Sequence, residues 1–269
     1  MKDFFKGKTV AITGGSDGIG KALTELLLAA GANVATCARS QDKLNTLQEN
    51  NAGKPLLCIA ADVSIYGDCK HFIETTLNHF NTIDILINNA GISMRAELKD
   101  ADVTIIKKLM DVNFMGTVYC TKLALESLLK TKGTVVGVSS IAGYRGLPGR
   151  SGYSASKFAM NGWLEALRTE LLDDGVNVMW VAPGFTKSNI RNAALNKHAE
   201  AQGESPLDEQ SLMTPEEVAQ EILTAIEKRR RTLVLTFTGK RTVLMNKFFA
   251  SLTDRLTKNF FYKNGKLVK

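Results

Sequence analysis

The sequence contains few of the residues that build disulfides and metal sites. Its 269 residues include 4 cysteines and 3 histidines. No two cysteines have the Cys-x-x-Cys spacing, and the histidines show neither His-Glu-x-x-His nor any other ligand spacing. Cys37 and Cys58 fall in expected buried strands, where cysteine behaves as a small apolar residue. We therefore expect neither disulfides nor a catalytic metal.

Long apolar runs are missing as well, and the first residues do not read as a signal peptide. No run of 18 apolar residues is present, so the sequence predicts no transmembrane helix. Residues 1–8 are too few and too charged for a signal peptide. We expect a cytoplasmic protein, or one that lies on the cytoplasmic side of a membrane.

Hydrophobic residues make up 44% of the chain, enough for one large core. Strand-like and helical stretches alternate along it. The expected strands are 8–13, 33–37, 55–60, 83–87, 134–138 and 177–181, and the expected helices are 21–30, 67–80, 101–130 and 154–174. This alternation predicts an α/β fold with a doubly wound parallel sheet of the Rossmann type. We assign residues 1–239 to this domain and residues 240–269 to a C-terminal extension of it.

A glycine-rich turn follows the first expected strand. The run Gly14-Gly-Ser-Asp-Gly-Ile-Gly20 separates that strand from the first expected helix. Glycine permits a tight turn and lets the backbone approach a diphosphate, which the helix N-terminus attracts. An ordinary strand-to-helix turn can carry the same residues. Its position after a strand near the N-terminus favours a dinucleotide site.

The end of the second expected strand indicates which dinucleotide binds. Ala38-Arg39-Ser40 has no acidic residue, although a site for NAD usually places one against the ribose 2′-hydroxyl. Guanidinium binds phosphate in a fork, so Arg39 and Ser40 suit the 2′-phosphate of NADP. The alternative is a solvated arginine at a strand end. We expect NADP(H) to be favoured by roughly one to two decades.

Three side chains form a pattern suited to proton transfer. Tyr153 lies 13 positions after Ser140, and Lys157 would share a helix face with Tyr153. A nearby cation lowers the pKa of a phenol from its usual value of about 10, and the Ser140 hydroxyl can bind a substrate oxygen. Alone, Tyr-x-x-x-Lys also suits a helix start with a solvated lysine. Together with the glycine turn, it indicates an oxidoreductase.

These motifs together resemble the short-chain dehydrogenase/reductase family over about residues 8–226. The match comprises Thr13-Gly-x-x-x-Gly-Ile-Gly20, Asp62-Val63, Asn88-Asn-Ala-Gly91, Asn113, Ser140, Tyr153, Lys157 and Pro183-Gly184. The resemblance implies that Tyr153 is the general acid in reduction, that Ser140 orients the carbonyl and that Lys157 binds the nicotinamide ribose. It also implies that Asn113 anchors a proton-relay water.

The resemblance also implies a cofactor groove along the ends of several strands. Asp62 and Val63 would flank the adenine, and the loop with Phe185, Thr186, Ser188 and Ile190 would close over cofactor and substrate. The expected cofactor contacts are Gly14, Ser16, Asp17, Gly18, Ile19, Gly20, Arg39, Ser40, Asp62, Val63, Asn89, Ala90, Gly91, Tyr153, Lys157, Pro183, Gly184 and Thr186.

Positive charge is concentrated at the C-terminus. Residues 228–269 carry twelve lysines and arginines and one acid, Asp254, within a chain whose net charge is +7. Apolar residues recur at three- and four-residue steps between Val243 and Phe261, as on one face of a helix. This basic amphipathic helix could dock on its own domain or a dimer partner, on an anionic membrane, or on acidic acyl carrier protein or acyl-CoA. Nucleic acid is a poor fit, because the Phe stripe is expected to face inward.

The leading hypothesis is an NADPH-dependent carbonyl reductase or alcohol dehydrogenase that acts on a hydrophobic, lipid-like ketone or alcohol. The extended tail resembles the branch of the family that reduces lipid, steroid or sphingoid ketones. A 3-oxoacyl-thioester reductase is the enzymatic alternative, although many of these stop at a Gly-Gly ending that this chain lacks. A nucleotide-binding regulatory protein without turnover is the alternative of another class. We expect a homodimer or homotetramer.

Overall fold

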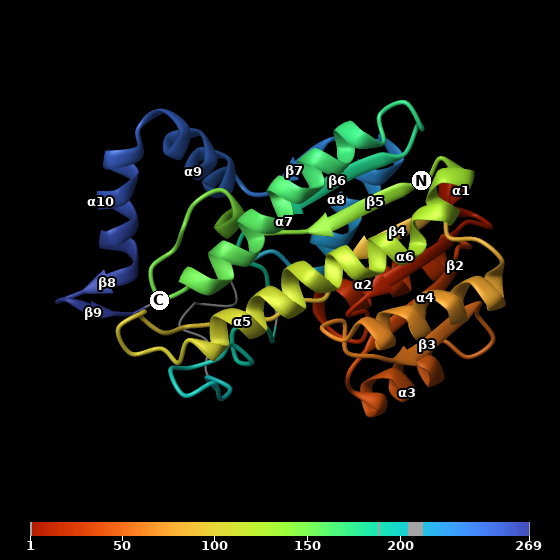
Figure 1. Ribbon diagram of the computed structural model, residues 1–269, viewed down its shortest axis with the longest axis horizontal. Coiled ribbons are helices and arrows are strands. Elements are labelled where there is room, and N and C mark those ends of the chain that lie inside the picture. The colour runs from red at the N-terminus through yellow and green to blue at the C-terminus, as the bar shows by residue number, and fades with distance from the viewer. Residues whose placement is uncertain (1, 188, 204–211, 269) are drawn as a thin grey trace.

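The computed structural model describes residues 2–187, 189–203 and 212–268, and it shows a parallel sheet enclosed by helices (Figure 1). Within the described residues, seven strands pair in the order β3-β2-β1-β4-β5-β6-β7, and every pairing is parallel. The strands are β1 (Thr9–Thr13), β2 (Asn33–Ala38), β3 (Leu56–Ala60), β4 (Ile85–Asn88), β5 (Thr134–Val138), β6 (Asn177–Ala182) and β7 (Thr232–Val234). The predicted doubly wound α/β fold is confirmed.

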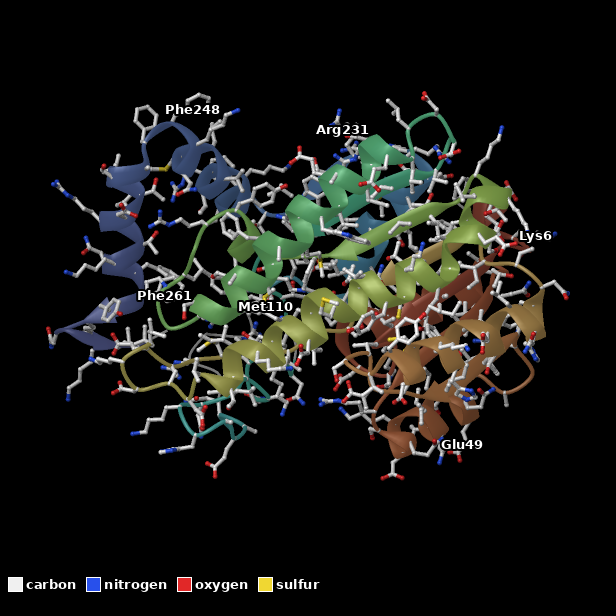
Figure 2. The ribbon with its side chains drawn as sticks, viewed as in Figure 1. Lys6, Glu49, Met110, Arg231, Phe248 and Phe261 are labelled. Atoms are coloured by element: carbon white, nitrogen blue, oxygen red, sulfur yellow. The ribbon has the colours of Figure 1, made fainter. Side chains whose placement is uncertain are left out.

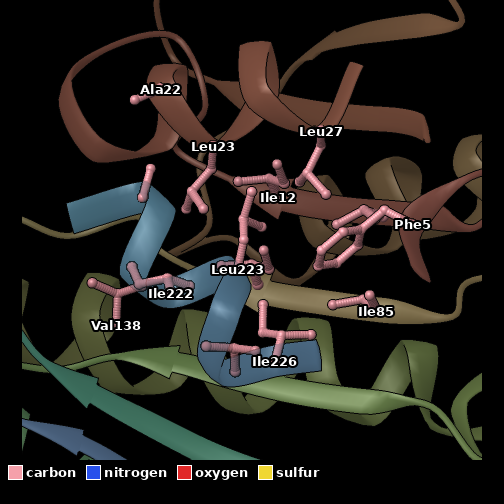
Figure 3. Packing of buried hydrophobic residues seen from close by; sticks show 14 of the residues in the cluster. Phe5, Ile12, Ala22, Leu23, Leu27, Ile85, Val138, Ile222, Leu223 and Ile226 are labelled. Atoms are coloured by element: carbon pink, nitrogen blue, oxygen red, sulfur yellow. The ribbon is translucent and has the colours of Figure 1, made fainter. Parts of the chain in front are cut away.

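Helices cover both faces of the sheet. They are α1 (Lys2–Phe5), α2 (Gly18–Ala29), α3 (Gln41–Asn50), α4 (Tyr66–Phe80), α5 (Thr104–Met110), α6 (Gly116–Thr131), α7 (Ser151–Glu170) and α8 (Pro215–Glu227). On one face, Leu23 and Leu27 of α2 pack with Leu223 and Ile226 of α8 beside Ile12 of β1 (Figure 3). The helices α4, α6 and α7 pack on the other face. Burial of each such side chain contributes about 1.5–3 kcal/mol, so this core holds the strand ends in place.

The strand order reverses between β1 and β4. Strands β1, β2 and β3 run to one side of this point, and β4, β5 and β6 run to the other. In an open parallel sheet, ligands bind outside the carboxyl ends of the strands where the order reverses. The glycine-rich turn after β1 and the residues after β4 meet at this place.

The expected helix 101–130 is interrupted. The structure has α5 and α6 with a π-helical turn, η1 (Asp111–Met115), between them. A π-turn adds a residue to the helical turn and is frequent at functional sites. Asn113 lies in η1, and its side chain hydrogen-bonds with both backbone groups of Ile92. Residue periodicity did not reveal this turn, because the apolar pattern continues through it.

The C-terminal extension forms two helices instead of one. These are α9 (Phe237–Phe248) and α10 (Ala250–Phe261), followed by a hairpin of β8 (Tyr262–Lys263) and β9 (Lys266–Leu267). The backbone leaves the helical region at Phe249, where φ is −135° and ψ is 54°. In Figure 1, α10 and the hairpin stand at one side of the domain, beyond the start of α7.

Polar contacts tie the extension to the domain. Arg145 forms an ion pair with Asp254 and donates a hydrogen bond from Nη1 to Asn246 Oδ1 at 2.9 Å. Tyr262 donates its hydroxyl proton to Glu97 Oε1 at 2.8 Å. This hydrogen bond lowers the pKa of Glu97.

The apolar stripe of the extension does not face inward as a whole, which corrects the expectation from sequence. Phe261 is only 3% exposed, whereas Phe248 and Phe249 are 63% and 62% exposed. Figure 2 shows Phe248 at the outer corner between α9 and α10 and Phe261 on the side of the domain. The break at Phe249 is the physical reason, because the two helices do not share one continuous face. Among the described helices, none is both long and apolar enough to cross a membrane.

Candidate active site

The glycine-rich turn forms a tight cradle between β1 and α2. Gly14 has φ +71°, and a Cβ on it would lie 2.9 Å from the Ala90 Cα. A Cβ on Gly20 would overlap the carbonyl oxygen of Gly14. Asp17 caps α2 by accepting a hydrogen bond from Gly18 N at 2.8 Å. Only glycine fits at this close approach, and the N-terminus of α2 suits a diphosphate.

Hydrogen bonds join this cradle to the end of β4. Asn89 Nδ2 donates to the carbonyl oxygens of Thr13 and Gly14, both at 3.0 Å. The Thr13 hydroxyl oxygen accepts from the backbone N–H groups of Asn89 and Ala90 at 3.0 Å. These bonds fix the two loops at the reversal point, so the groove has its shape before a ligand enters.

Arg39 and Ser40 lie at the end of β2, on the rim of the same groove. Ser40 also caps α3, where its Oγ accepts a hydrogen bond from Lys43 N at 3.4 Å. Lys43 forms an ion pair with Asp17 across the groove. Arg39 is exposed, and within the described chain it has no ion-pair partner. A cationic rim of this kind can bind a phosphate.

Ser140, Tyr153 and Lys157 gather beyond the end of β5. Ser140 begins the short helix η2 (Ile141–Gly143), and its Oγ accepts a hydrogen bond from Ala142 N at 3.1 Å. Tyr153 lies in the first turn of α7, two residues after the helix begins at Ser151. Lys157 Nζ lies 5.9 Å from the centroid of the Tyr153 ring. The three expected side chains therefore share one wall of the site.

The electrostatics of this wall differ from the sequence expectation. Burial raises the pKa of Tyr153, while the Ser140 hydroxyl and the Arg150 guanidinium act in the opposite direction. Burial lowers the pKa of Lys157 to about 7, and its Nζ donates to Val138 O at 2.8 Å. The expectation that Lys157 lowers the pKa of the phenol is thus wrong for this structure. Arg150 is the cation that acts on Tyr153, and burial outweighs it.

Asn113 lies behind the site. Its Oδ1 accepts from Ile92 N at 2.8 Å, and its Nδ2 donates to Ile92 O at 3.0 Å and to Ser156 Oγ at 2.9 Å. These bonds connect η1, the loop after β4 and α7. Asn113 therefore holds together the loop that carries Gly91 and the helix that carries Lys157.

A single cavity of about 730 Å³ contains nearly all the expected residues. Every expected cofactor contact lines it except Gly20, which lies beneath the turn, and Asn113 does not line it either. Ile190 and Phe185 also line it, whereas Ser188 lies outside the described residues. Within the described residues, no cluster of three His, Cys, Asp or Glu side chains is arranged to hold a metal.

Sequence reasoning missed two parts of this cavity. One is the arginine pair Arg150 and Arg191, and the other is the wall that the extension supplies through Met245, Leu256 and Phe260. The Phe185 and Phe260 rings stack with centroids 6.3 Å apart. The apolar periodicity identified the extension as amphipathic, but it could not show which residues face the site.

The comparison with known protein families decides the identity of this fold. Residues 8–199 match the family described as short chain dehydrogenase. The chain belongs to the short-chain dehydrogenase/reductase family. It is therefore an oxidoreductase of that family. The sequence predicted this from the glycine-rich turn and from Ser140, Tyr153 and Lys157. A regulatory protein without turnover is the weaker interpretation.

Curated members of the family are similar over most of the chain. Dehydrogenase/reductase SDR family member 7B of Xenopus laevis is 35% identical over 242 residues, which are 86% of this chain and 75% of that protein. The 11-beta-hydroxysteroid dehydrogenase-like protein 4A of Arabidopsis thaliana is 38% identical over 193 residues, which are 70% of this chain and 64% of that protein. These names agree with the predicted resemblance to the steroid branch of the family.

Solved structures of short-chain dehydrogenase/reductases share the fold. One from Streptomyces avermitilis has a TM-score of 0.80 at 26% identity and covers 95% of this chain and 99% of its own. One from Burkholderia phymatum, in complex with NAD, has a TM-score of 0.82 at 21% identity and covers 92% of this chain and 95% of its own. An alcohol dehydrogenase from Thermococcus sibiricus, complexed with 5-hydroxy-NADP, has a TM-score of 0.73 at 24% identity and covers 85% of this chain and 95% of its own.

Proposed function

We propose that the protein is an NADPH-dependent carbonyl reductase that acts on a hydrophobic, lipid-like ketone, or on the corresponding alcohol in reverse. The observation that carries this proposal is the composition of the cavity. It runs from the glycine-rich turn past Ser140 and Tyr153 to an apolar wall formed by Met245, Leu256 and Phe260. Such a wall favours an apolar substrate, because removal of apolar surface from water contributes about 25 cal/mol per Å².

The groove fits a nicotinamide dinucleotide. The Gly14 and Gly20 contacts leave room for a diphosphate against the backbone, and the Asp62 and Val63 side of the cavity can receive the adenine. Arg39 lies on the rim of this groove at the end of β2, where its guanidinium could bind a 2′-phosphate, and this motivates the proposal of NADPH over NADH. When bound, the nicotinamide supplies the hydride to the carbonyl carbon.

The chain's own residues handle the proton and the developing charge. In the proposed step, Tyr153 donates its phenolic proton to the carbonyl oxygen, and Ser140 donates a hydrogen bond to the same oxygen. The Arg150 guanidinium stabilises the phenolate that remains, since it acts against the effect of burial on the pKa of Tyr153. Lys157, one turn further along α7, is placed to hold the nicotinamide ribose.

The proposal is tested by NADPH oxidation against a panel of ketones. We expect turnover of long-chain ketosphingoid or steroid ketones, with kcat/KM well above that of small aromatic ketones, because only the former reach the apolar wall. Preferential turnover of 3-oxoacyl thioesters would replace the proposed substrate class. An absence of turnover across the whole panel, with NADPH bound, would contradict an active reductase.

We also propose that the corner between α9 and α10 contacts anionic membranes. Phe248 and Phe249 are exposed at this corner, and Leu244, Lys240 and Lys247 are exposed along α9, which leads to it. Apolar side chains that insert between headgroups, with cations beside them, are typical of helices that lie on a membrane surface. Each lysine or arginine near an anionic surface contributes about 1 kcal/mol. A lipid-like substrate could then enter the cavity from the membrane.

Vesicle co-sedimentation tests the membrane proposal. We expect the purified protein to bind phosphatidylglycerol vesicles at low salt and to dissociate from them at high salt. It should not bind neutral vesicles at either salt concentration. Phe248→Ser should weaken binding at least tenfold, since burial of a Phe side chain contributes about 1.5–3 kcal/mol. Leu172→Ser, at an exposed apolar residue that follows α7 and lies outside the C-terminal extension, is the matched control. Unchanged vesicle binding by Phe248→Ser would contradict the proposal. If the unmodified protein binds no vesicles and Phe248→Ser changes its oligomeric mass, the corner is a subunit interface instead.

A further inference from the structure

The C-terminal hairpin has a well-formed turn but little to stabilise it by itself. Its strands β8 and β9 pair antiparallel, with Tyr262 opposite Leu267. The turn between them is Asn264-Gly265, with φ +50° and +73°, which is typical of the type I′ turn that two-residue hairpins prefer. A hairpin of two short strands is at best marginally stable in water. The surface on which it packs therefore indicates its role.

The hairpin packs on the loop that leads into α7 (Figure 1). A Cβ added to Gly149 would overlap Leu267 Cδ2, so the half-buried Leu267 side chain rests directly on the Gly149 backbone. The Gly149 carbonyl oxygen accepts a hydrogen bond from Ala96 N at 2.9 Å. Tyr262, which faces Leu267 across the hairpin, donates to Glu97 Oε1 at 2.8 Å. The hairpin thus holds two neighbouring loops of the domain together.

The start of α7 has no side-chain cap to hold it. Arg150 is the N-cap residue, and its side chain makes no capping hydrogen bond within the described chain. Helix ends without such a cap fray more easily. Two bonds connect the loop with the first turn of α7, from Leu147 N to Ser154 Oγ at 3.1 Å and from Ser154 N to Arg150 O at 2.8 Å. Because Gly149 lies between Leu147 and Arg150, both bonds depend on its position.

The next turn of α7 is anchored without the hairpin. Lys157 Nζ donates to Val138 O at 2.8 Å, and Ser156 Oγ accepts from Asn113 Nδ2 at 2.9 Å. These contacts fix this part of α7 to the sheet and to η1. Tyr153 lies between the anchored part and the uncapped end. Movement of the helix end would therefore displace Tyr153 while Lys157 stays in place.

We propose that the C-terminal hairpin is a positioning element of the active site, and that Leu267 holds the first turn of α7, and with it Tyr153, through Gly149. This inference rests on the proposed carbonyl reductase and deepens it. Leu267 is not among the described residues that line the cavity, so it acts on the reaction only through the loop. Such a contact matters, because displacement of a reacting group by about 1 Å can lower the rate about a hundredfold.

Leu267→Ala removes the contact with Gly149. With the ketone that the unmodified enzyme reduces best, we expect kcat to fall by about tenfold to a hundredfold, while KM for the ketone and Kd for NADPH stay within about twofold. Leu267→Met keeps an apolar side chain of similar volume and should retain kcat within about twofold. Val268→Ala, at the next residue, which is 37% exposed, is the matched control and should leave kcat unchanged.

A double variant tests whether the effect passes through Tyr153. In Tyr153→Phe the phenolic proton is already missing, so its position no longer matters. Addition of Leu267→Ala to this variant should therefore lower kcat by less than about twofold, because residues that act as a unit are not additive. If Leu267→Ala causes its full loss in this background as well, Leu267 does not act by positioning the phenolic hydroxyl, and the proposal is wrong.

Amide hydrogen exchange measures the start of α7 directly and requires no turnover. In the NADPH-loaded protein, the amides of residues 147–156 should exchange at least about tenfold faster in Leu267→Ala than in the unmodified protein, because local opening becomes easier. The amides of residues 159–170 should exchange at the same rate in both. Unchanged exchange at residues 147–156, or equal acceleration along all of α7, would overturn the positioning role.

Two kinetic results would overturn it as well. One is a kcat within about twofold of the unmodified enzyme in Leu267→Ala. The other is a loss of NADPH affinity as large as the loss of kcat, which would indicate general loosening of the fold. Failure of the proposed reductase has a different signature, because the unmodified protein would then reduce no ketone. The exchange rates would still report whether the hairpin holds the start of α7.

Discussion

Tyr153→Phe is expected to reduce kcat by about 10²–10⁴-fold while NADPH affinity stays within about twofold. The phenolic hydroxyl is the proposed proton donor, and general acid catalysis contributes about that much. Tyr153 is buried in the apolar cluster with Met94 and Leu109, and the ring of the variant retains these contacts. The fold should therefore be unaffected. Single-turnover kinetics with saturating NADPH, and fluorescence titration of NADPH, provide the two measurements.

Lys157→Ala supplies the contrast to this variant. It should weaken both turnover and NADPH binding, because Lys157 is proposed to hold the nicotinamide ribose. Residual kcat above about a tenth of the unmodified enzyme in Tyr153→Phe would assign the proton to another donor. A loss of NADPH affinity in Tyr153→Phe as large as that in Lys157→Ala would likewise contradict the separation of their roles.

Arg39→Asp is expected to reverse the cofactor preference. The unmodified enzyme should favour NADPH by roughly one to two decades in kcat/KM, since a charge-assisted hydrogen bond contributes about 1.5–3 kcal/mol. The aspartate removes this attraction and repels the 2′-phosphate, while it can accept hydrogen bonds from the ribose hydroxyls of NADH. The ratio of kcat/KM for the two cofactors should thus change by more than a hundredfold.

Arg39→Ala separates the two contributions. It removes the attraction without adding repulsion, so its cofactor ratio should lie between those of the unmodified enzyme and Arg39→Asp. Ser40 remains in both variants and continues to cap α3. Equal kcat/KM for NADPH and NADH in the unmodified enzyme would refute the preference for NADPH without any variant.

The sheet and the groove could be predicted from sequence because local patterns determine them. Runs such as Thr134–Val138 are buried on both faces and therefore read as continuous apolar strands. The short strand β7 follows a run of arginines, Arg229 to Arg231, and offers only three residues, so periodicity could not detect it. The break at η1 was invisible for a related reason, since a π-turn changes backbone hydrogen bonds and leaves the apolar pattern intact.

The residues of the proposed catalytic wall could be predicted from the sequence, whereas most residues of the proposed substrate wall could not. Ser140, Tyr153 and Lys157 lie close together in the chain and occupy motif positions. Arg191 and Phe260 reach the same cavity from segments far from those motifs, so only tertiary packing shows that they belong to it. The exposure of Phe248 was unpredictable for the same reason, because an apolar stripe does not specify which surface it meets.

The apolar wall has a consequence for how the enzyme can diversify. The proposed hydride transfer uses residues between Gly14 and Thr186. Met245, Leu256 and Phe260 instead lie on a segment that is attached to the domain through Arg145, Asn246 and Tyr262. Mutations in α9 and α10 can therefore change which molecules are accepted without disturbing the chemistry that is performed on them. Exchange of this segment between related enzymes is accordingly a direct route to new substrate ranges, in natural selection and in the laboratory.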